Sequence, residues 1–247
     1  MTAPFITLEG IGGTGKSTAR NYIGKLFQDH HLDPVLTREP GGTLCAEHLR
    51  KLVREGFPGA NPKEPLDVLD PMAVALLFNA ARVDHVNKVI RPSIESGRVV
   101  VSDRYCDTTF AYQSTYDGLP LEKLKQLHEL VVGVNPDKTF IFTCPPYIAA
   151  SRISDAEKQS DKFDRASLEQ QEAMQQVFLD LYKTDADRYT LIDASYGLDE
   201  VREQLFPHLM KIIRPLTKPV KGQCKGGCPD CVKPRVPSIK IPSHLMS

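Results

Sequence analysis

The feature that most constrains this chain is the glycine-rich stretch at residues 10–17, Gly-Ile-Gly-Gly-Thr-Gly-Lys-Ser, directly after the apolar run 5–8. It fits the phosphate-loop pattern of glycine, four free positions, glycine, lysine, and serine or threonine. Glycines let backbone N–H groups turn inward around a polyphosphate, and a helix beginning near Lys16 adds the positive end of its dipole. The stretch therefore predicts a binding loop for a nucleoside triphosphate.

Within this loop each polar residue has an expected task. Lys16 can reach the outer phosphates, and the Ser17 hydroxyl can ligate Mg²⁺. A glycine-rich turn without a ligand is the alternative, and the apolar run before it and the helical pattern after it disfavour that alternative. The residues predicted to contact ATP here are Gly10, Gly12, Gly13, Thr14, Gly15, Lys16, Ser17 and Thr18.

Short β-branched runs alternate with helical patterns along the chain, which predicts a parallel sheet with helices on both faces. Strands are expected at 5–8, 34–37, 98–102, 139–143 and 189–192. Helices are expected at 16–27, 45–55, 72–95, 107–114, 121–132, from 147 to 152, 167–183 and 198–213. Four prolines predict a surface loop at 56–71, and Pro92 is expected to kink the long third helix.

Composition restricts the class of protein without naming an activity. The 247 residues suffice for one α/β domain with length to spare, and 31 basic residues balance 31 acidic ones. No apolar run is long enough for a membrane span, and the first four residues lack signal-peptide features. Six cysteines, partly scattered, suit a reducing compartment, so we expect a cytoplasmic protein with no membrane partner.

Four blocks, in order and spacing, resemble the thymidylate kinases of bacterial type. They are the phosphate loop, Thr-Arg-Glu-Pro-Gly-Gly-Thr at 37–43, Leu-Phe-Asn-Ala-Ala-Arg at 77–82, and the segment 103–113 that begins Asp-Arg-Tyr. The resemblance covers about residues 4–212. It implies the phosphate-loop NTPase fold of the nucleoside-monophosphate kinases, with a five-stranded parallel sheet and a lid. It also implies transfer of a phosphoryl group from ATP with Mg²⁺ to dTMP, and a symmetric homodimer.

Two anionic phosphates must approach each other in such an enzyme, so guanidinium groups are needed to offset their repulsion. The resemblance implies Arg50 and Arg104 for this task, with Arg38 in support and with Glu39 and Pro40 at the acceptor; Arg50 could instead lie on a solvated helix face. Asp103, after the third strand, is expected to hold Mg²⁺ through water, with a helix-capping role as the alternative.

The acceptor base is expected beside Phe78 and Arg82, which lie four apart on one helix face. A ring can stack on a base, and Arg82 can donate to the O4 of thymine or uracil, where cytosine presents an amino donor. Core packing is the alternative for Phe78. Thr109 and Gln113 resemble base-edge contacts of the family, and Tyr112 resembles the residue that crowds the sugar 2′ position.

On the donor side, the segment at Asp193 resembles the part of the family that passes the adenine. The polar stretch 154–165 is expected to form a lid at about 153–166, with a solvated loop as the alternative. The resemblance implies catalytic roles for Arg152 and Arg165 in addition to Lys16 and Arg104, and it makes Lys158 and Lys162 further candidates.

Three departures from the family pattern leave alternatives open. Gly12 replaces an acidic residue associated with the acceptor 3′-hydroxyl, the lid carries Lys162 where arginine is usual, and Ser114 replaces glycine. A viral or divergent kinase for a modified pyrimidine deoxynucleotide is one alternative. A catalytically impaired homologue that binds nucleotide or nucleic acid is another. A guanine-nucleotide switch is disfavoured, because residues 135–138 hold the required residue types in the wrong order.

The composition changes at the carboxyl end, so we predict a kinase domain over 1–213 and an extension over 214–247. Prolines from Pro215 onward are expected to prevent helix formation. Cys224, Cys228 and Cys231 could share a structural Zn²⁺, with His244 or another subunit's thiolate as fourth ligand. An extended tail with reduced thiols is the favoured interpretation. The tail is basic but has no aromatic residues, so we expect no nucleic-acid partner.

Overall fold

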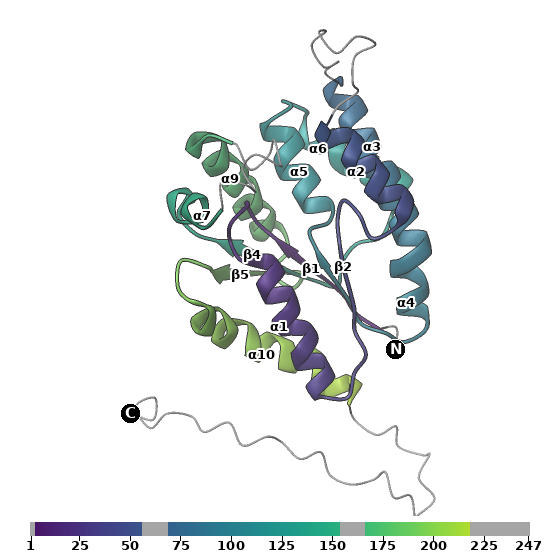
Figure 1. Ribbon diagram of the computed structural model, residues 1–247, viewed down its shortest axis with the longest axis vertical. Coiled ribbons are helices and arrows are strands. Elements are labelled where there is room, and N and C mark those ends of the chain that lie inside the picture. The colour runs from purple at the N-terminus through teal and green to yellow at the C-terminus, as the bar shows by residue number, and fades with distance from the viewer. Residues whose placement is uncertain (1–2, 56–68, 154–165, 218–247) are drawn as a thin grey trace, which may run out of the picture. The chain divides into compact units, whose positions relative to one another are not determined.

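The structure is a computed structural model that describes residues 3–55, 69–153 and 166–217. Five parallel strands form one sheet in the order β2-β3-β1-β4-β5 (Figure 1). The strands are β1 (Phe5–Glu9), β2 (Val35–Arg38), β3 (Val100–Asp103), β4 (Lys138–Thr143) and β5 (Tyr189–Asp193). All five strands lie within two residues of the predicted ranges, and the predicted α/β class with a five-stranded parallel sheet is confirmed.

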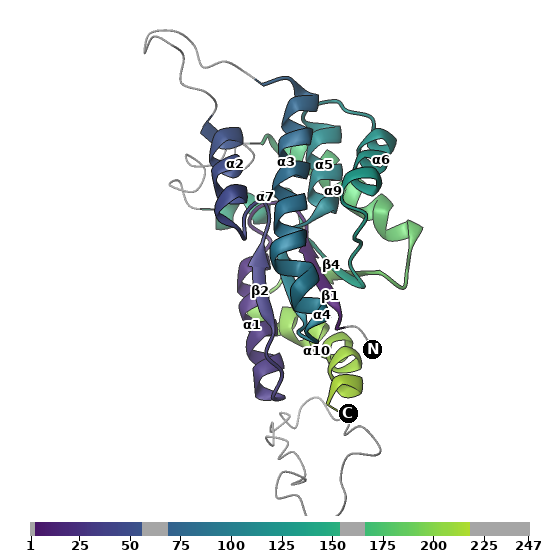
Figure 2. The ribbon, with the colours of Figure 1, turned by 90° about the vertical axis from the view of Figure 1, so that its right-hand side faces the viewer.

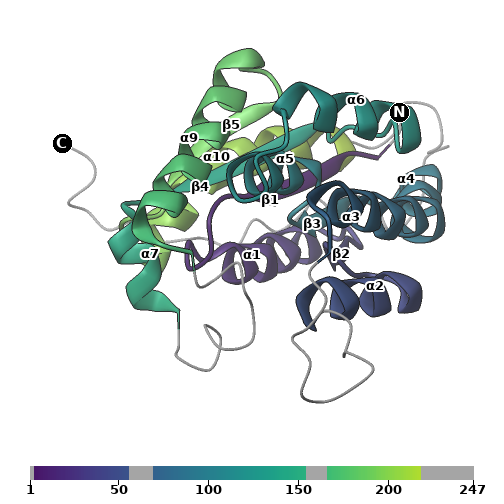
Figure 3. The same ribbon diagram turned by 90° about the horizontal axis from the view of Figure 1, so that it is seen from above.

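Helices cover both faces of the sheet. Helices α1 (Lys16–Asp29) and α10 (Leu198–Leu216) pack against each other, and α5 (Cys106–Thr115), α6 (Leu121–Val131) and α9 (Leu168–Thr184) lie on the other side of the sheet from α1 (Figures 1 and 3). The remaining helices are α2 (Leu44–Glu55), α3 (Pro71–His85), α4 (Arg91–Glu95) and α7 (Pro146–Arg152). Figure 2 shows α3 and α4 in one line beside β2.

The core lies along β1, whose five residues are all buried between neighbouring strands and helices. Phe5 packs edge-on against Tyr105, with ring centroids 4.9 Å apart. On α1 the buried Ala19, Ile23 and Phe27 recur every four residues and place one apolar stripe on the sheet. Burying one such large side chain contributes roughly 1.5–3 kcal/mol, so this stripe holds α1 and the loop before it in place.

The strand order brings the phosphate loop next to the carboxyl end of β3. Leu8 of β1 pairs with Asp103 of β3, and the Arg104 N–H donates to the Leu8 carbonyl at 2.9 Å. In open parallel sheets, ligands bind outside the carboxyl ends of the strands, where the strand order reverses. The fold therefore places residues 10–17 and 103–104 at one edge, although almost ninety positions separate them in sequence.

The helix predicted over 72–95 is not regular. Between α3 and α4 lies a π-helical segment, η1 (Val86–Ile90), in which the Arg91 N–H donates to the Val86 carbonyl, five residues back. The wider turn makes room for the ring of Pro92, which would otherwise clash with the preceding turn. The kink expected from Pro92 thus takes the form of a π-helical segment directly before the proline.

The last helix also corrects an expectation. We expected it to end at Ile213 and Pro215 to begin non-helical chain, but α10 continues to Leu216 with Pro207 and Pro215 inside it. Both prolines are exposed, whereas Leu205, Leu209 and Ile213 are buried. A proline costs a helix interior about 3 kcal/mol, and this apolar stripe offsets that cost by packing on the core.

Candidate active site

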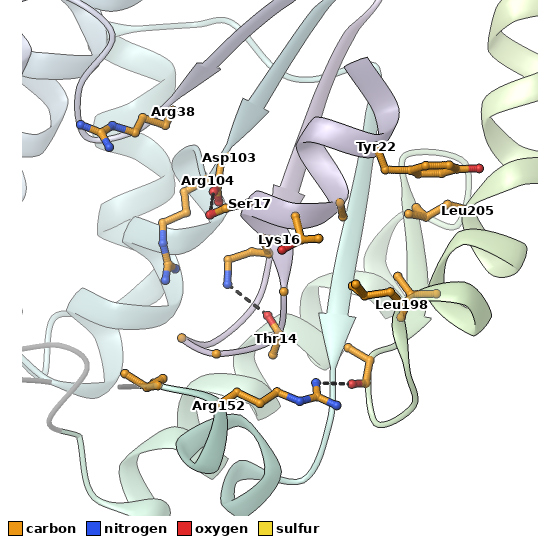
Figure 4. A pocket seen from close by; sticks show the side chains of 18 of the residues that line it. Thr14, Lys16, Ser17, Tyr22, Arg38, Asp103, Arg104, Arg152, Leu198 and Leu205 are labelled. Atoms are coloured by element: carbon orange, nitrogen blue, oxygen red, sulfur yellow. Dashed lines mark hydrogen bonds between the residues drawn. The ribbon is translucent and has the colours of Figure 1, made fainter. Parts of the chain in front are cut away.

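A cavity of about 580 Å³ opens at the carboxyl edge of the sheet (Figure 4). It extends from the phosphate loop toward α10 on one side and toward β2 and α2 on the other. Most of the predicted donor and phosphate-binding residues of the described chain line it. They are Gly12, Gly13, Thr14, Gly15, Lys16, Ser17, Thr18, Arg38, Glu39, Arg50, Asp103, Arg104 and Arg152.

The phosphate loop adopts a backbone that requires glycine. Gly13 has a φ of 76°, and a Cβ placed on it would lie 2.1 Å from the Ala149 carbonyl oxygen. Gly15, with a φ of 84°, directly precedes α1, which begins at Lys16. The backbone therefore turns sharply into the helix, and its N–H groups and the helix dipole are available to an anion.

Lys16 and Ser17 are fixed by short hydrogen bonds at the start of α1. The Lys16 Nζ donates to the Ile11 carbonyl at 2.5 Å and to the Thr14 Oγ1 at 3.1 Å. The Ser17 hydroxyl donates to the Asp103 Oδ2 at 2.6 Å. Figure 4 shows Lys16 and Ser17 facing the same side of the cavity as Asp103 and Arg104.

A hydroxyl and a carboxylate in contact are hard oxygen ligands and suit Mg²⁺, which usually takes few protein ligands together with water and substrate phosphates. Ser17 and Asp103 thus fit the ion. In the described ranges there is no cluster of three or more His, Cys, Asp or Glu side chains that could hold a metal without substrate.

The far end of the cavity is lined by side chains that the sequence did not single out. They are Tyr22, Tyr196, Leu198, Val201, Arg202 and Leu205. The Arg202 guanidinium lies 5.4 Å from the centre of the Tyr22 ring. An apolar and aromatic lining suits a flat nucleobase.

Asp193, which was predicted on the donor side, is not among the residues that line the cavity, whereas its neighbour Ala194 is. The Asp193 side chain is exposed, and its Oδ1 accepts from the Ser195 N–H at 2.9 Å.

Arg152, at the end of α7, binds the loop after β5. Its Nη1 donates to the Ala194 carbonyl at 2.6 Å, and its Nη2 donates to the carbonyls of Ser195 and Tyr196 at 3.2 and 3.1 Å. These contacts hold the loop that carries Tyr196, a residue that lines the cavity. The catalytic role expected for Arg152 stays a prediction; the geometry adds a structural task on the donor side.

Arg104 lies at the junction between the cavity and a smaller pocket. Its Nη1 donates to the Gly10 carbonyl at 3.1 Å and contacts the Thr108 and Tyr112 hydroxyls at 3.4 Å each. Arg50 lines both spaces as well, and its Nη1 donates to the Pro40 carbonyl at 3.0 Å. The two guanidinium groups thus face the region between donor and acceptor subsites. Arg38 lines the cavity with an exposed side chain paired to Glu47 at 3.2 Å.

The smaller pocket has a volume of about 150 Å³. It gathers residues from the β2–α2 loop, α2, α3, the turn after β3 and α5. They are Glu39, Pro40, Arg50, Arg54, Phe78, Arg82, Arg104, Tyr105, Thr108, Thr109, Tyr112 and Gln113. Every residue predicted to contact the acceptor nucleotide is in this lining, and Arg54, Tyr105 and Thr108 are additions that the sequence did not indicate.

Arg82 is buried and held by a chain of polar partners. Its Nε donates to the Glu39 Oε2 at 2.7 Å, and the other oxygen of Glu39 contacts the His85 Nδ1 at 2.9 Å. The His85 Nε2 contacts the Thr37 Oγ1 at 2.7 Å. A Cβ at Gly42, whose φ is 86°, would lie 2.4 Å from that ring nitrogen, so only glycine fits beside His85. We call Thr37, His85, Glu39 and Arg82 the buried relay.

Arg82 lines the small pocket, and its guanidinium has further partners in the turn after β3 and in α5. Its Nη2 donates to the Tyr105 carbonyl at 3.1 Å and to the Thr109 Oγ1 at 2.9 Å. Burial alone would lower the pKa of Arg82, but the Glu39 carboxylate helps to raise it, so the group is charged. The Arg82 Nη1 and the Gln113 Nε2 are buried donors with no partner among the residues that the structure describes. Two unpartnered donors lining one small pocket indicate a ligand with two acceptors.

A buried pair of acidic residues that the sequence did not indicate, Glu9 and Asp107, lies close to Arg104. Glu9 at the end of β1 is fully buried, and Asp107 beside it pairs with Arg188 at 2.5 Å and accepts from the Tyr189 hydroxyl at 3.1 Å. Burial, and then the negative charge of Asp107, raise the pKa of Glu9 to about 8. Glu9 therefore keeps its proton at neutral pH, because Asp107 has the cationic partner.

This shift predicts a pH dependence of stability. Glutamate in the unfolded chain ionises near pH 4.5, whereas Glu9 in the fold ionises near pH 8. Between these values the folded state binds more protons, so the free energy of unfolding falls as the pH rises. Relative to Glu9→Gln, the wild type should lose about 3 kcal/mol between pH 5 and 8, measured by urea unfolding. An equal difference in stability between wild type and Glu9→Gln at pH 5 and pH 8 would contradict the assignment. Glu122→Gln, an exposed control that keeps Glu9, should instead follow the wild type at both pH values.

Several predicted residues lie outside the described residues. These are Arg165, Lys158 and Lys162 of the expected lid, and Cys224, Cys228, Cys231 and His244 of the carboxyl extension. Across the described ranges, no helix is both long and apolar enough to cross a lipid bilayer.

Comparison with known proteins gives a consistent family. The family model described as thymidylate kinase matches residues 8–205. A thymidylate kinase of Dinoroseobacter shibae is 38% identical over 211 residues, which are 85% of this chain and 98% of that protein. One of Pseudomonas fluorescens is 40% identical over 219 residues, covering 87% and 100%. The crystal structure of thymidylate kinase from Ehrlichia chaffeensis superimposes with a TM-score of 0.60 at 29% identity, covering 85% of this chain and 99% of that one.

Proposed function

This chain belongs to the thymidylate kinase family, and we propose that it transfers the γ-phosphoryl group of ATP to the 5′-phosphate of dTMP, giving dTDP and ADP. The cavity of about 580 Å³ takes ATP, with its phosphates on the loop before α1. The pocket of about 150 Å³ takes the pyrimidine, and Arg104 lies where the two meet.

The pair of unpartnered donors in the small pocket carries this proposal. Thymine and uracil present the acceptors O2 and O4, whereas cytosine presents an amino donor in place of O4. With a cytosine base, the buried Arg82 Nη1 would face another donor, and leaving a charged donor without an acceptor costs 1–3 kcal/mol or more. Phe78 lines the same pocket and supplies a ring for stacking.

The reaction requires little covalent chemistry from the protein. A 5′-phosphate oxygen of dTMP is already a competent nucleophile, so positioning and neutralisation of charge account for most of the catalysis. Lys16 and the loop N–H groups hold the donor phosphates, while Arg104 and Arg50 offset the charge of the acceptor phosphate. Mg²⁺, held through Ser17 and Asp103, would neutralise the charge on the transferred phosphoryl group when bound. No covalent intermediate on the protein is required.

The test is steady-state phosphorylation of dTMP, dUMP, dCMP and dGMP, each with ATP. We expect the highest kcat/KM with dTMP, a lower value with dUMP, and values for dCMP and dGMP at least about 100-fold below that for dTMP. Equal turnover of dCMP and dTMP would show that the two buried donors do not select the base. The impaired homologue and the modified acceptor are not favoured over dTMP, because the relatives across most of the chain are thymidylate kinases.

Arg152 provides a separate prediction for the donor side. Arg152→Gln should raise KM for ATP about five- to tenfold, because the loop bearing Tyr196 loses three carbonyl contacts, and KM for dTMP should change less than twofold. The control is Arg98→Gln, whose exposed side chain lies on the turn before β3 and pairs with Asp33. A kcat reduced 100-fold with unchanged KM for ATP would favour a catalytic cation instead.

Other expectations extend this function. We expect Mg²⁺ with ATP as cofactor, a homodimer, and a cytoplasmic location, in line with the family resemblance and the cysteine content. Arg165 of the lid remains a candidate catalytic cation. The zinc alternative for Cys224, Cys228 and Cys231 also remains a prediction, to be decided by metal analysis of the purified protein.

A further inference from the structure

Glu9 has no task in the proposed reaction, yet it is a buried polar residue that contacts the segment around Arg104. It ends β1, directly before the phosphate loop, and is fully buried. Its Oε1 accepts from the Tyr105 backbone N–H at 2.7 Å, and its Oε2 contacts the Thr108 hydroxyl at 2.5 Å. Both contacts lie on the segment that carries Arg104.

The backbone of Arg104 is in a conformation that needs support. Its φ is 70°, in the left-handed region, which is unfavourable for a residue other than glycine. Three contacts hold it there. The Arg104 N–H donates to the Leu8 carbonyl at 2.9 Å, its own carbonyl accepts from the Ser102 hydroxyl at 2.8 Å, and the next N–H, of Tyr105, donates to Glu9.

The guanidinium of Arg104 depends on the same carboxyl through Thr108. The Arg104 Nη1 contacts the Thr108 Oγ1 at 3.4 Å and the Gly10 carbonyl at 3.1 Å. Whichever oxygen carries the shared proton, the Thr108 hydroxyl that is bound to Glu9 keeps a lone pair for the Arg104 N–H. Glu9 and its neighbour Gly10 thus hold the backbone and the side chain of one arginine.

We infer that Glu9 is a positioning residue that couples the phosphate loop to Arg104 and sets the place of the acceptor phosphate. The inference rests on the proposed role of Arg104 in binding the 5′-phosphate of dTMP. Any shift of residues 9–10 moves the contacts that orient Arg104, so donor and acceptor phosphates are aligned through one buried side chain. Misplacement of such a group by about 1 Å can reduce the rate 100-fold.

Three charged groups on neighbouring elements surround Glu9, and they are compatible with a protonated Glu9 that holds Tyr105 and Thr108 by hydrogen bonds. On α5, Asp107 repels a charge on Glu9, and on the turn after β3, Arg104 attracts one. Arg188, before β5, is paired with Asp107. Glutamine can make both contacts of protonated Glu9, since its oxygen can accept from Tyr105 and its amide can donate to Thr108.

The test compares paired variants at pH 7 with ATP and dTMP. Thr108→Val keeps the shape of the side chain but removes the hydroxyl, and we expect kcat/KM for dTMP to fall roughly tenfold, with KM for ATP within twofold. Thr108→Ser should recover most of this loss. Glu9→Leu should lower kcat/KM for dTMP at least as much, and Glu9→Gln should recover most of it. The double variant Glu9→Leu/Thr108→Val should lose little more than Glu9→Leu alone, because both changes break one path.

Three results would overturn the inference: valine and serine at 108 behaving alike, Glu9→Leu raising KM for ATP and dTMP equally, or fully additive losses in the double variant. Thr108→Val keeps the test valid if Glu9→Leu does not fold. A wild-type protein without dTMP kinase activity would instead refute the proposed function, so the two failures are distinguishable.

Discussion

Replacing Lys16 by methionine should lower kcat/KM for phosphoryl transfer at least about 1,000-fold, a loss of roughly 4 kcal/mol of transition-state stabilisation. Methionine has nearly the length of lysine but no charge. The Lys16 side chain is buried, and its Nζ lies 2.5 Å from the Ile11 carbonyl and 3.1 Å from the Thr14 Oγ1. The cation is therefore placed inside the curve of the phosphate loop, where charge develops on the transferred group.

The measurement is steady-state kinetics with saturating dTMP, together with ATP affinity by calorimetry and the melting temperature. Lys25→Met is the matched control, because Lys25 is an exposed lysine on the same helix α1, and its activity should remain within twofold. A loss of less than tenfold in Lys16→Met, with the fold intact, would show that the loop does not hold the reacting phosphates in the proposed way.

Arg82→Lys should lower kcat/KM for dTMP about 100-fold while ATP affinity changes less than threefold. Lysine keeps a positive charge beside the buried Glu39, so the fold should survive this substitution. Arg82→Ala, in contrast, would remove the cationic partner of that carboxylate. It cannot, however, contact Glu39, Tyr105 and Thr109 together and still present a donor to the base. The loss should therefore fall on the acceptor.

The control for this variant is Arg91→Lys, an exposed arginine on α4, which should leave both substrates unaffected. Kinetics with dTMP and dCMP, and ATP binding by calorimetry, distinguish the outcomes. A parallel loss of ATP affinity would mean that the base pocket has been assigned to the wrong side of the cleft.

Local patterns were sufficient to predict the regular parts of the fold. The strands and the phosphate loop follow from short apolar runs and from glycine spacing, both of which act within a few residues. The π segment before Pro92 and the continuation of α10 through Pro207 and Pro215 could not be predicted in this way. Before Pro92 the wider turn accommodates the proline ring, whereas in α10 the packing of the buried apolar stripe offsets the cost of the two prolines.

In the site, too, local sequence patterns predict some residues, whereas others become evident only from the fold. Residues in family blocks, such as Arg82 and Gln113, were found because the pattern is specific, and they line one pocket. Glu9 and His85 were missed because a single acidic or basic residue in sequence is usually exposed, and only the fold shows both to be fully buried. Tyr196 and Leu198 could not be predicted either, because two apolar residues beside a glycine form no recognisable binding motif. Only the fold shows that they line the cavity.

The buried relay has a consequence for how such an enzyme can diverge. Each residue of the relay is the hydrogen-bond partner of the next one. Replacing any one of them therefore leaves a buried polar group of its neighbour without a partner. A mutational step toward another nucleobase would have to pass through a less stable intermediate, or change two members at once. Drift in acceptor preference should therefore begin at lining residues outside the relay, such as Arg54 on α2, and reach the relay last.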